Sequence, residues 1–360
     1  MSKTFRFLAV ETSDPLHLSS PFSARFPDPI KYLPAKGLCE AFDAAMLLGM
    51  PLLLTGEPGT GKTRAAYWLA RQLGARLLRH DVKSTSTGRD LLYSFDEVAR
   101  FRDASAARPR PLIDYIRFSA LGEAIVRASA GAALAPLRSG AQVPADAFAG
   151  DPAALTVADL LPEDPAFTAE TPPAHSVVLI DELDKAPRDT PNDLLAEVEH
   201  MAFDVPELGI RITAQTDWRP IVVITSNSER ALPEPFLRRC LYFDIPPPEE
   251  GELAEIVALS IDGVAAGTRL FVSAWRFYDA LREAEGVRKR PGTAEFLVWT
   301  SCLVAQAGYT PGEALGNGAD HRARIAPTLI CLVKAFDDLA IARRLLADSK
   351  WLSTRGGSGA

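Results

Sequence analysis

The chain has 360 residues, of which 47% are hydrophobic and 24% charged, and its formal net charge is -7. This composition predicts a globular protein with room for two or three domains. The acidic balance argues against broad electrostatic capture of nucleic acid or of an anionic membrane, although the basic run GVRKR (286–290) leaves a smaller contact open. No apolar run approaches the roughly 20 residues that a membrane-spanning helix needs.

Cysteine usage and the N-terminus both bear on the cellular compartment. The four cysteines, Cys39, Cys240, Cys302 and Cys331, show no paired spacing, which predicts reduced thiols in a cytoplasmic protein. The first residues, MSKTFRFLAVETSDP, are not expected to act as a secretory signal, because their apolar core is too short and an acidic residue comes early. The scattered histidines form no metal-binding pattern.

Strands and helices alternate in the first two thirds of the chain. A helix is predicted over residues 36–50, and the short apolar run PLLLTG (51–56) after it is typical of a strand buried on both faces. A helix over TRAAYWLARQLG follows and ends at Gly74. Four more strands are predicted, at 75–82, 177–181, 221–226 and 241–245. This order predicts an α/β domain with a parallel sheet and right-handed crossovers.

The interval between the second and third strands is unusually long. Its middle, residues 128–174, is rich in Ala, Pro and Gly and predicts a flexible insertion. After PPPEE (246–250) only helical patterns follow, at 252–261, 270–286, 293–308 and 328–348. We therefore expect an N-terminal segment (1–34), an α/β domain (35–248), an all-helical domain (249–350) and a flexible tail (351–360).

The stretch GEPGTGKT fits the pattern G-x-x-x-x-G-K-[ST] and lies between a predicted buried strand and a helix. Its glycines let backbone N–H groups surround a phosphate chain, and the helix N-terminus adds partial positive charge. Lys62 would reach the β- and γ-phosphates, and the Thr63 hydroxyl would bind Mg²⁺. This context disfavours a chance glycine-rich turn. The predicted ATP-binding residues are Gly56, Glu57, Pro58, Gly59, Thr60, Gly61, Lys62, Thr63 and Arg64.

Polar side chains end the third and fourth predicted strands. VVLIDELDKAP leads into Asp181 and Glu182, and alternation along a strand would turn these neighbours to opposite sides. We expect Asp181 to hold Mg²⁺ and Glu182 to polarise a water that attacks the γ-phosphate. Asn227, which ends ITSN, is expected to bind the same water or the γ-phosphate; an asparagine-led turn is the alternative.

In this order and with a helical region after them, GEPGTGKT, LIDELDKAP, ITSN and PFLRRC resemble an AAA+ ATPase module. Within that superfamily, DLLYSFDEVARFRD, YIRFSALGEA, DKAPRDTPNDLL and ITSNSERALPEPFLRRC resemble MoxR-type ATPases. The resemblance spans residues 35–350. It implies a P-loop fold with a five-stranded parallel sheet flanked by helices and followed by an all-helical lid, and assembly into a ring, most often a hexamer.

The resemblance also implies roles for several arginines. Arg238 and Arg239 occupy the place of the arginine that completes the ATP site of a neighbouring subunit, where a guanidinium stabilises the charge of the breaking phosphoryl bond. Solvated cations at a helix end are the alternative. The lid position of a phosphate-sensing arginine falls near Ala294, for which Arg288 or Arg290 could substitute if they do not simply form a solvated basic turn.

The expected function is Mg²⁺-dependent ATP hydrolysis in a ring that remodels or matures a protein partner, which the resemblance implies to be a protein with a von Willebrand A domain. One alternative is a nucleic-acid-acting AAA+ motor or the nucleotide-driven subunit of a restriction complex. Another is a nucleotide-gated scaffold, against which Glu182 argues. Tyr32 and Leu33 are expected either to pack on adenine or to belong to the core.

Overall fold

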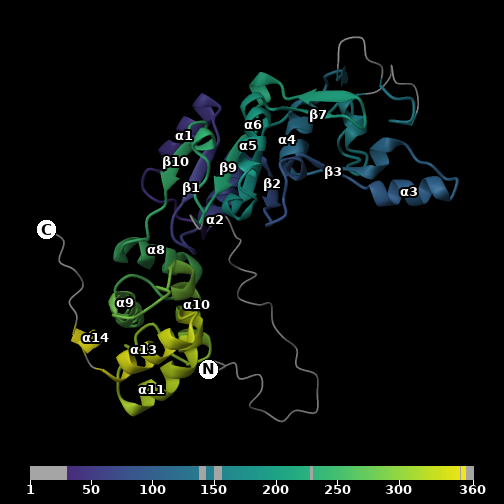
Figure 1. The fold of residues 1–360 in the computed structure, drawn as a ribbon. Coiled ribbons are helices and arrows are strands. Elements are labelled where there is room, and N and C mark those ends of the chain that lie inside the picture. Colours follow the sequence, from purple (N-terminus) through teal and green to yellow (C-terminus); the bar gives the residue numbers. More distant parts are fainter. Residues whose placement is uncertain (1–30, 138–142, 150–155, 228–229, 349, 354–360) are drawn as a thin grey trace. The chain divides into compact units, whose positions relative to one another are not determined.

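The computed structural model describes residues 31–137, 143–149, 156–227, 230–348 and 350–353 (Figure 1). Contacts divide the chain into two units. An α/β unit holds residues 36–56 and 62–245, and a helical unit holds the loop Glu57–Gly61, the described residues before Lys36, and the chain from Pro246 onward. The predictions made for residues 1–30 and 354–360 lie outside the described residues.

A five-stranded parallel sheet forms the centre of the α/β unit and confirms the predicted fold. The strand order is β10-β1-β9-β6-β2, and every neighbouring pair is parallel. The carboxyl ends of all five strands therefore lie along one edge of the sheet. The strands are β1 (Leu52–Thr55), β2 (Arg76–Asp81), β6 (Ser176–Asp181), β9 (Ile221–Thr225) and β10 (Leu241–Asp244).

Helices cover the sheet because its three inner strands, β1, β9 and β6, are almost wholly buried. All six residues of β6 are buried, as expected for a central parallel strand. Helix α2 (Lys62–Leu73) contacts β6, β2 and β9, α4 (Ala120–Ala128) contacts β6 and β2, and α1 (Leu38–Leu48) contacts β10 and β1. Gly74 ends α2 with φ 59°, as the sequence predicted.

The interval between β2 and β6 is folded where it is described, so the prediction of a flexible insertion over 128–174 is wrong for these residues. Their buried apolar side chains, among them Phe148, Val157, Leu160 and Phe167, join the core of the α/β unit. A few well-spaced apolar residues thus anchor a segment whose average composition indicates a loop.

Two small antiparallel sheets and several short helices complete the α/β unit (Figure 1). One sheet pairs β3 (Tyr93–Phe95) with β4 (Ile116–Phe118), and α3 (Glu97–Ser105) lies between these strands in the sequence. The other has the order β5-β8-β7 and comprises β5 (Ala135–Pro136), β7 (Ala202–Val205) and β8 (Ile210–Thr213). The short helices are α5 (Thr190–Asp193), α6 (Leu195–His200) and α7 (Glu234–Leu237).

The helical unit has its own core, in which aromatic rings such as Phe277, Phe296 and Trp299 are fully buried. The tail begins later than residue 351, because Trp351 is 1% exposed and packs edge-on against Phe277. The continuous helical pattern at 328–348 is broken near Val333 into two helices. The helices are α8 (Glu250–Ser260), α9 (Arg269–Glu283), α10 (Thr293–Ala305), α11 (Ala319–Ile325), α12 (Leu329–Leu332), α13 (Phe336–Ala347) and α14 (Lys350–Ser353).

No helix in the described part of the chain is both long enough and apolar enough to cross a bilayer.

Candidate functional site

The glycine-rich loop between β1 and α2 needs its glycines. Gly56, Gly59 and Gly61 have φ values of 134°, 85° and 94°, a region that side chains with a Cβ rarely adopt. Lys62, the first residue of α2, is 6% exposed, and its Nζ donates to the Gly56 carbonyl oxygen at 2.8 Å. The lysine side chain thus turns back toward Gly56 at the carboxyl end of β1.

Lys62 is a buried cation surrounded by carboxylates. Burial lowers the pKa of Lys62, and the negative charges of Asp184, Asp181, Asp244 and Glu182 oppose that shift. Burying an ammonium group is unfavourable unless anions compensate it. A phosphate chain in the loop would supply further compensation, which is the role that the sequence predicted for Lys62.

Asp181 ends β6 and is 6% exposed. One carboxylate oxygen, Oδ1, accepts hydrogen bonds from the hydroxyls of Thr63 at 3.0 Å and Thr225 at 2.6 Å. The other oxygen accepts one from the Arg79 guanidinium at 3.0 Å. The structure therefore brings together Thr63 and Asp181, the two residues predicted to hold Mg²⁺.

The oxygens of Thr63 and Asp181 suit Mg²⁺. Among the residues that the structure describes, no group of three or more His, Cys, Asp or Glu side chains is arranged to hold a metal ion. Mg²⁺ usually takes only one or two protein oxygens and completes its octahedral shell with phosphate oxygens and water. The pair fits a metal ion that arrives with a nucleotide better than one held by protein alone.

Glu182 lies just beyond β6 in a left-handed conformation, with φ 61° and ψ 51°. Its carboxylate Oε1 accepts a hydrogen bond from Asn227 Nδ2 at 3.0 Å, and Oε2 pairs with Lys185. Its backbone N–H donates to Thr225 Oγ1 at 2.8 Å. This turn orients Glu182, whereas the sequence argument relied on strand alternation. Glu182 and Asn227 are nevertheless neighbours, as expected for two residues that contact one water.

Three residues at this edge of the sheet were missed by the sequence analysis: Arg79, Asp184 and Thr225. Asp184 is 3% exposed and accepts the backbone N–H of Asn227 at 3.2 Å, which fixes the backbone just after β9. Thr225, two residues before Asn227 in ITSN, could have been found because alternate residues of a strand share a face. Arg79 carried no such signal.

The loop residues 57–61 pack within the helical unit. Arg282, in the last turn of α9, donates to Glu57 Oε2 at 3.2 Å and to the Pro291 carbonyl at 2.7 Å. Ala294 lies against Gly59, because a Cβ added to that glycine would come within 3.2 Å of the Ala294 Cβ. Arg282 is thus a cation beside the loop that the sequence analysis did not single out.

The other residues discussed for the lid and for adenine lie as follows. Arg288 is exposed and pairs with Asp337 at 3.1 Å. Arg290 is also exposed. The Tyr32 ring is buried, and a Cβ on Gly61 would come within 3.0 Å of it.

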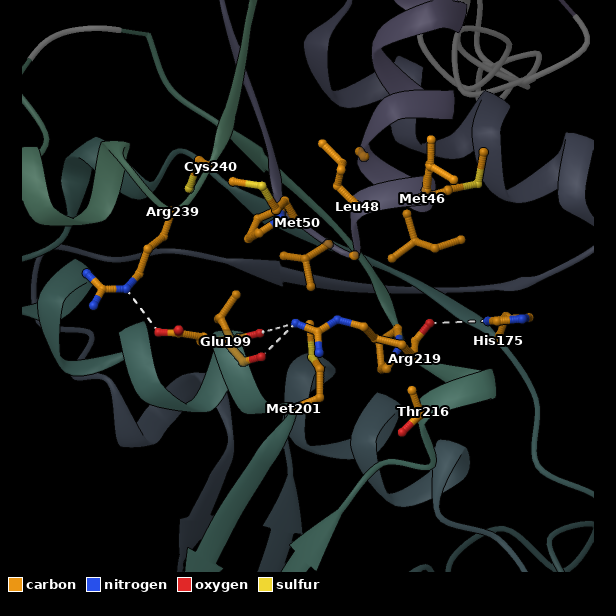
Figure 2. Close-up of a pocket in the computed structure, with 18 of the residues that line it drawn as sticks. Met46, Leu48, Met50, His175, Glu199, Met201, Thr216, Arg219, Arg239 and Cys240 are labelled. Atoms are coloured by element: carbon orange, nitrogen blue, oxygen red, sulfur yellow. Dashed lines mark hydrogen bonds and ion pairs between the residues drawn. The ribbon is translucent and has the colours of Figure 1, made fainter.

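Arg238 and Arg239 follow α7 and precede β10. Arg238 has a 79% exposed side chain that pairs with Glu234 at 3.0 Å, and Arg239 pairs with Glu199 at 3.0 Å (Figure 2). Because they come before β10, the arginines lie at the amino ends of the parallel strands, whereas Glu182 follows the carboxyl end of β6. A four-residue strand separates these edges by roughly 13 Å.

The two arginines line a cavity of about 840 Å³ in the α/β unit. Most of its lining is apolar, and Figure 2 shows Met46, Met50 and Met201 around it. Arg219 crosses the cavity and donates to the carbonyl oxygens of Val198 and Glu199 near the end of α6.

Comparison with known families agrees with this geometry. The family model described as AAA domain (dynein-related subfamily) matches residues 51–240, more than half of the chain. The match begins at the start of β1 and ends just before β10, so it includes the glycine-rich loop, the acidic residues after β6, Asn227 and both arginines. No curated protein matches the sequence. The chain therefore belongs to the dynein-related subfamily of AAA domains, a family of P-loop ATPases.

Proposed function

We propose that the protein is a cytoplasmic, Mg²⁺-dependent ATPase that assembles into a ring, most simply a hexamer, and uses hydrolysis to remodel a protein partner. The observation that carries the proposal is the 3.0 Å hydrogen bond between Glu182 and Asn227, at the same edge of the sheet as buried Lys62 and the Thr63–Asp181 pair. A carboxylate base beside a phosphate-binding loop is the arrangement that hydrolysis requires.

Each residue has a distinct task in this proposal. Lys62 and the loop N–H groups bind the β- and γ-phosphates, and Thr63 and Asp181 hold Mg²⁺, which when bound draws negative charge from the phosphate oxygens. Glu182 accepts a proton from the attacking water. Asn227 keeps the Glu182 carboxylate oriented through its amide group.

The proposed partner rests on a family resemblance and on one surface feature. The resemblance to MoxR-type ATPases suggests remodelling or maturation of a protein, with a von Willebrand A domain protein as the partner. A surface feature agrees with a protein partner: α3 has no buried residue and exposes the apolar side chains of Val98 and Phe101 by 80% and 76%.

The variant Glu182→Gln tests the hydrolytic role. It removes the base but keeps the shape of the side chain and its contact with Asn227, so we expect turnover to fall about 10²–10⁴-fold while ATP affinity is retained. Steady-state phosphate release and equilibrium binding of ATP measure the two quantities.

Glu163→Gln is the matched control, because Glu163 has a 78% exposed side chain and only a 3.7 Å ion pair with Arg117. Turnover should be unchanged in this variant. Unchanged turnover in Glu182→Gln would remove Glu182 from the mechanism, and a wild-type protein that binds no ATP would reject the proposed function as a whole.

A further inference from the structure

Two cysteines of the helical unit lie side by side although their spacing along the chain did not predict a pair. The sulfur atoms of Cys302 in α10 and Cys331 in α12 are 3.3 Å apart, and 29 positions separate the two residues in the sequence. Both residues are partly buried, and both thiols are free. A sulfur–sulfur bond is about 2.05 Å long, so the two sulfur atoms are already close to bonding distance.

The two thiols differ in acidity. The hydrogen bond with Cys302 and the positive charge of Lys334 lower the pKa of Cys331 to about 7, although burial acts in the opposite direction. The same hydrogen bond and burial raise the pKa of Cys302. Because the thiolate is the reactive form of cysteine, Cys331 is the nucleophile of the pair and Cys302 lies in position to react with its oxidised product.

We propose that Cys302 and Cys331 are a redox-reactive dithiol, which hydrogen peroxide converts into an intramolecular disulfide between α10 and α12. The Cys331 thiolate attacks one peroxide oxygen and the O–O bond breaks. The departing hydroxide takes up a proton, which yields water and leaves a sulfenic acid on Cys331. The Cys302 sulfur then attacks the Cys331 sulfur, the S–O bond breaks, and the thiol proton leaves with the second water. Two thiols lose two electrons, and one peroxide becomes two waters.

The position of the pair makes its oxidation relevant to the rest of the molecule. Helix α10 begins at Thr293, and the next residue, Ala294, lies against Gly59 of the glycine-rich loop within the helical unit. A covalent link from α10 to α12 would restrict the helix that contacts this loop. The inference concerns the thiols themselves and does not rest on the proposed ATPase function.

Peptide mapping of the oxidised full-length chain tests the proposal. The reduced protein is treated with hydrogen peroxide, blocked with iodoacetamide and digested with trypsin. Cleavage after Lys289, Arg322, Arg324 and Lys334 places the two cysteines in separate peptides, 290–322 and 325–334. We expect these peptides to be joined, the free thiols to fall from four to two, and dithiothreitol to restore all four.

Several outcomes would overturn the proposal: both peptides recovered unjoined and alkylated, Cys331 converted to a sulfinic acid without a bridge, or bridges that involve Cys39. Cys39→Ser is the first control, since it removes the exposed thiol and should leave the bridge intact. Cys240 is an internal reference, because burial raises the pKa of its thiol to about 12 and it should stay reduced.

Single variants separate the two steps. Cys302→Ser removes the second thiol, so dimedone should label a sulfenic acid on Cys331. Cys331→Ser should give no dimedone adduct on Cys302. Labelling of Cys302 in the second variant, or no labelling in the first, would contradict the assigned order of reaction. Circular dichroism establishes that the variants are folded. Whether the disulfide forms is decided by the peptide map of the wild-type protein, which does not depend on any variant.

Discussion

The Thr225 hydroxyl connects the ends of two strands at the candidate site. It donates to Asp181 at 2.6 Å and accepts the backbone N–H of Glu182 at 2.8 Å. Thr225 is 1% exposed, so water cannot readily replace these bonds. The left-handed backbone of Glu182 costs roughly 1–2 kcal/mol, and the bond from Thr225 helps to hold it in that conformation.

We predict that Thr225→Val impairs both stability and catalysis. Valine has nearly the same shape but cannot hydrogen-bond, so the Asp181 carboxylate and the Glu182 backbone N–H each lose one hydrogen bond. The unfolding free energy should therefore fall by about 1–3 kcal/mol. The ATPase kcat should also fall, since Glu182 loses its support. Denaturant unfolding and steady-state kinetics measure both effects. Thr225→Ser keeps the hydroxyl and is the control; if Val and Ser variants behave alike, the hydroxyl has no such role.

The sequence was sufficient to predict that several residues at strand ends and in the glycine-rich loop lie together at one edge of the sheet. Lys62 and Thr63 come from the loop pattern, and Asp181, Glu182 and Asn227 come from the rule that parallel strands end at one edge. Asp184 and Arg79 could not be predicted in the same way. The contact of Asp184 depends on the geometry of the turn after β6, and the contact of Arg79 depends on the rotamer of a long side chain. Neither feature can be read from a repeating pattern in the sequence.

At the level of secondary structure, the segment between β2 and β6 departs most from expectation. Its Ala-, Pro- and Gly-rich composition indicates a loop, yet Phe148 and Phe167 are each only 6% exposed. The average composition of the segment hides these apolar residues, because each of them is surrounded in the sequence by many small residues. The strands β1, β6, β9 and β10, by contrast, were predictable, since each contains a concentrated apolar run.

Phe148→Ala tests whether this segment contributes to the core. Removing a buried phenylalanine side chain costs about 3–5 kcal/mol where the cavity does not collapse, so the unfolding free energy of the α/β unit should fall by a comparable amount. Phe101→Ala is matched in chemistry but affects a side chain that is 76% exposed, and it should change stability by less than about 0.5 kcal/mol. Equal effects of the two variants would show that Phe148 is not a core residue.

The helical unit shows a different limit of sequence reasoning. Its amphipathic patterns predicted α8, α9 and α10, but the pattern at 328–348 continues through a break. Val333 and Ala335 are extended, and α13 then starts at Phe336. In this arrangement the buried Asp338 accepts the backbone N–H groups of Arg288 and Lys289 at 2.9 and 3.0 Å. Such a contact between segments 50 positions apart overrides the local helical periodicity.

Considered as a whole, the α/β unit separates Arg238 and Arg239 from its own Glu182 by the length of the sheet strands. We therefore predict that these arginines act on a neighbouring protomer. A protein lacking both arginines should be nearly inactive alone, because the charge of the breaking phosphoryl bond is not stabilised. Mixing it with Lys62→Ala should restore turnover, to roughly a quarter of the wild-type rate if the two variants assemble at random.

Phosphate release measures the recovery, and native mass spectrometry establishes that mixed assemblies form. Each variant measured alone is the control, since neither has both an intact loop and an intact neighbouring arginine. Mixed assemblies without any recovery would contradict action between protomers, whereas full activity of strictly monomeric protein would contradict it from the other direction.

The opposed locations of the arginines and the acidic edge have a consequence for symmetry. Two antiparallel copies can satisfy a contact between the arginine edge of one sheet and the acidic edge of the other, and so can a head-to-tail series of copies that all point the same way. In a head-to-tail series each added copy exposes the same unsatisfied surface again, so the series either closes after a whole number of copies or continues as an open helical filament. The angle between successive protomers, rather than the strength of their contact, decides between them.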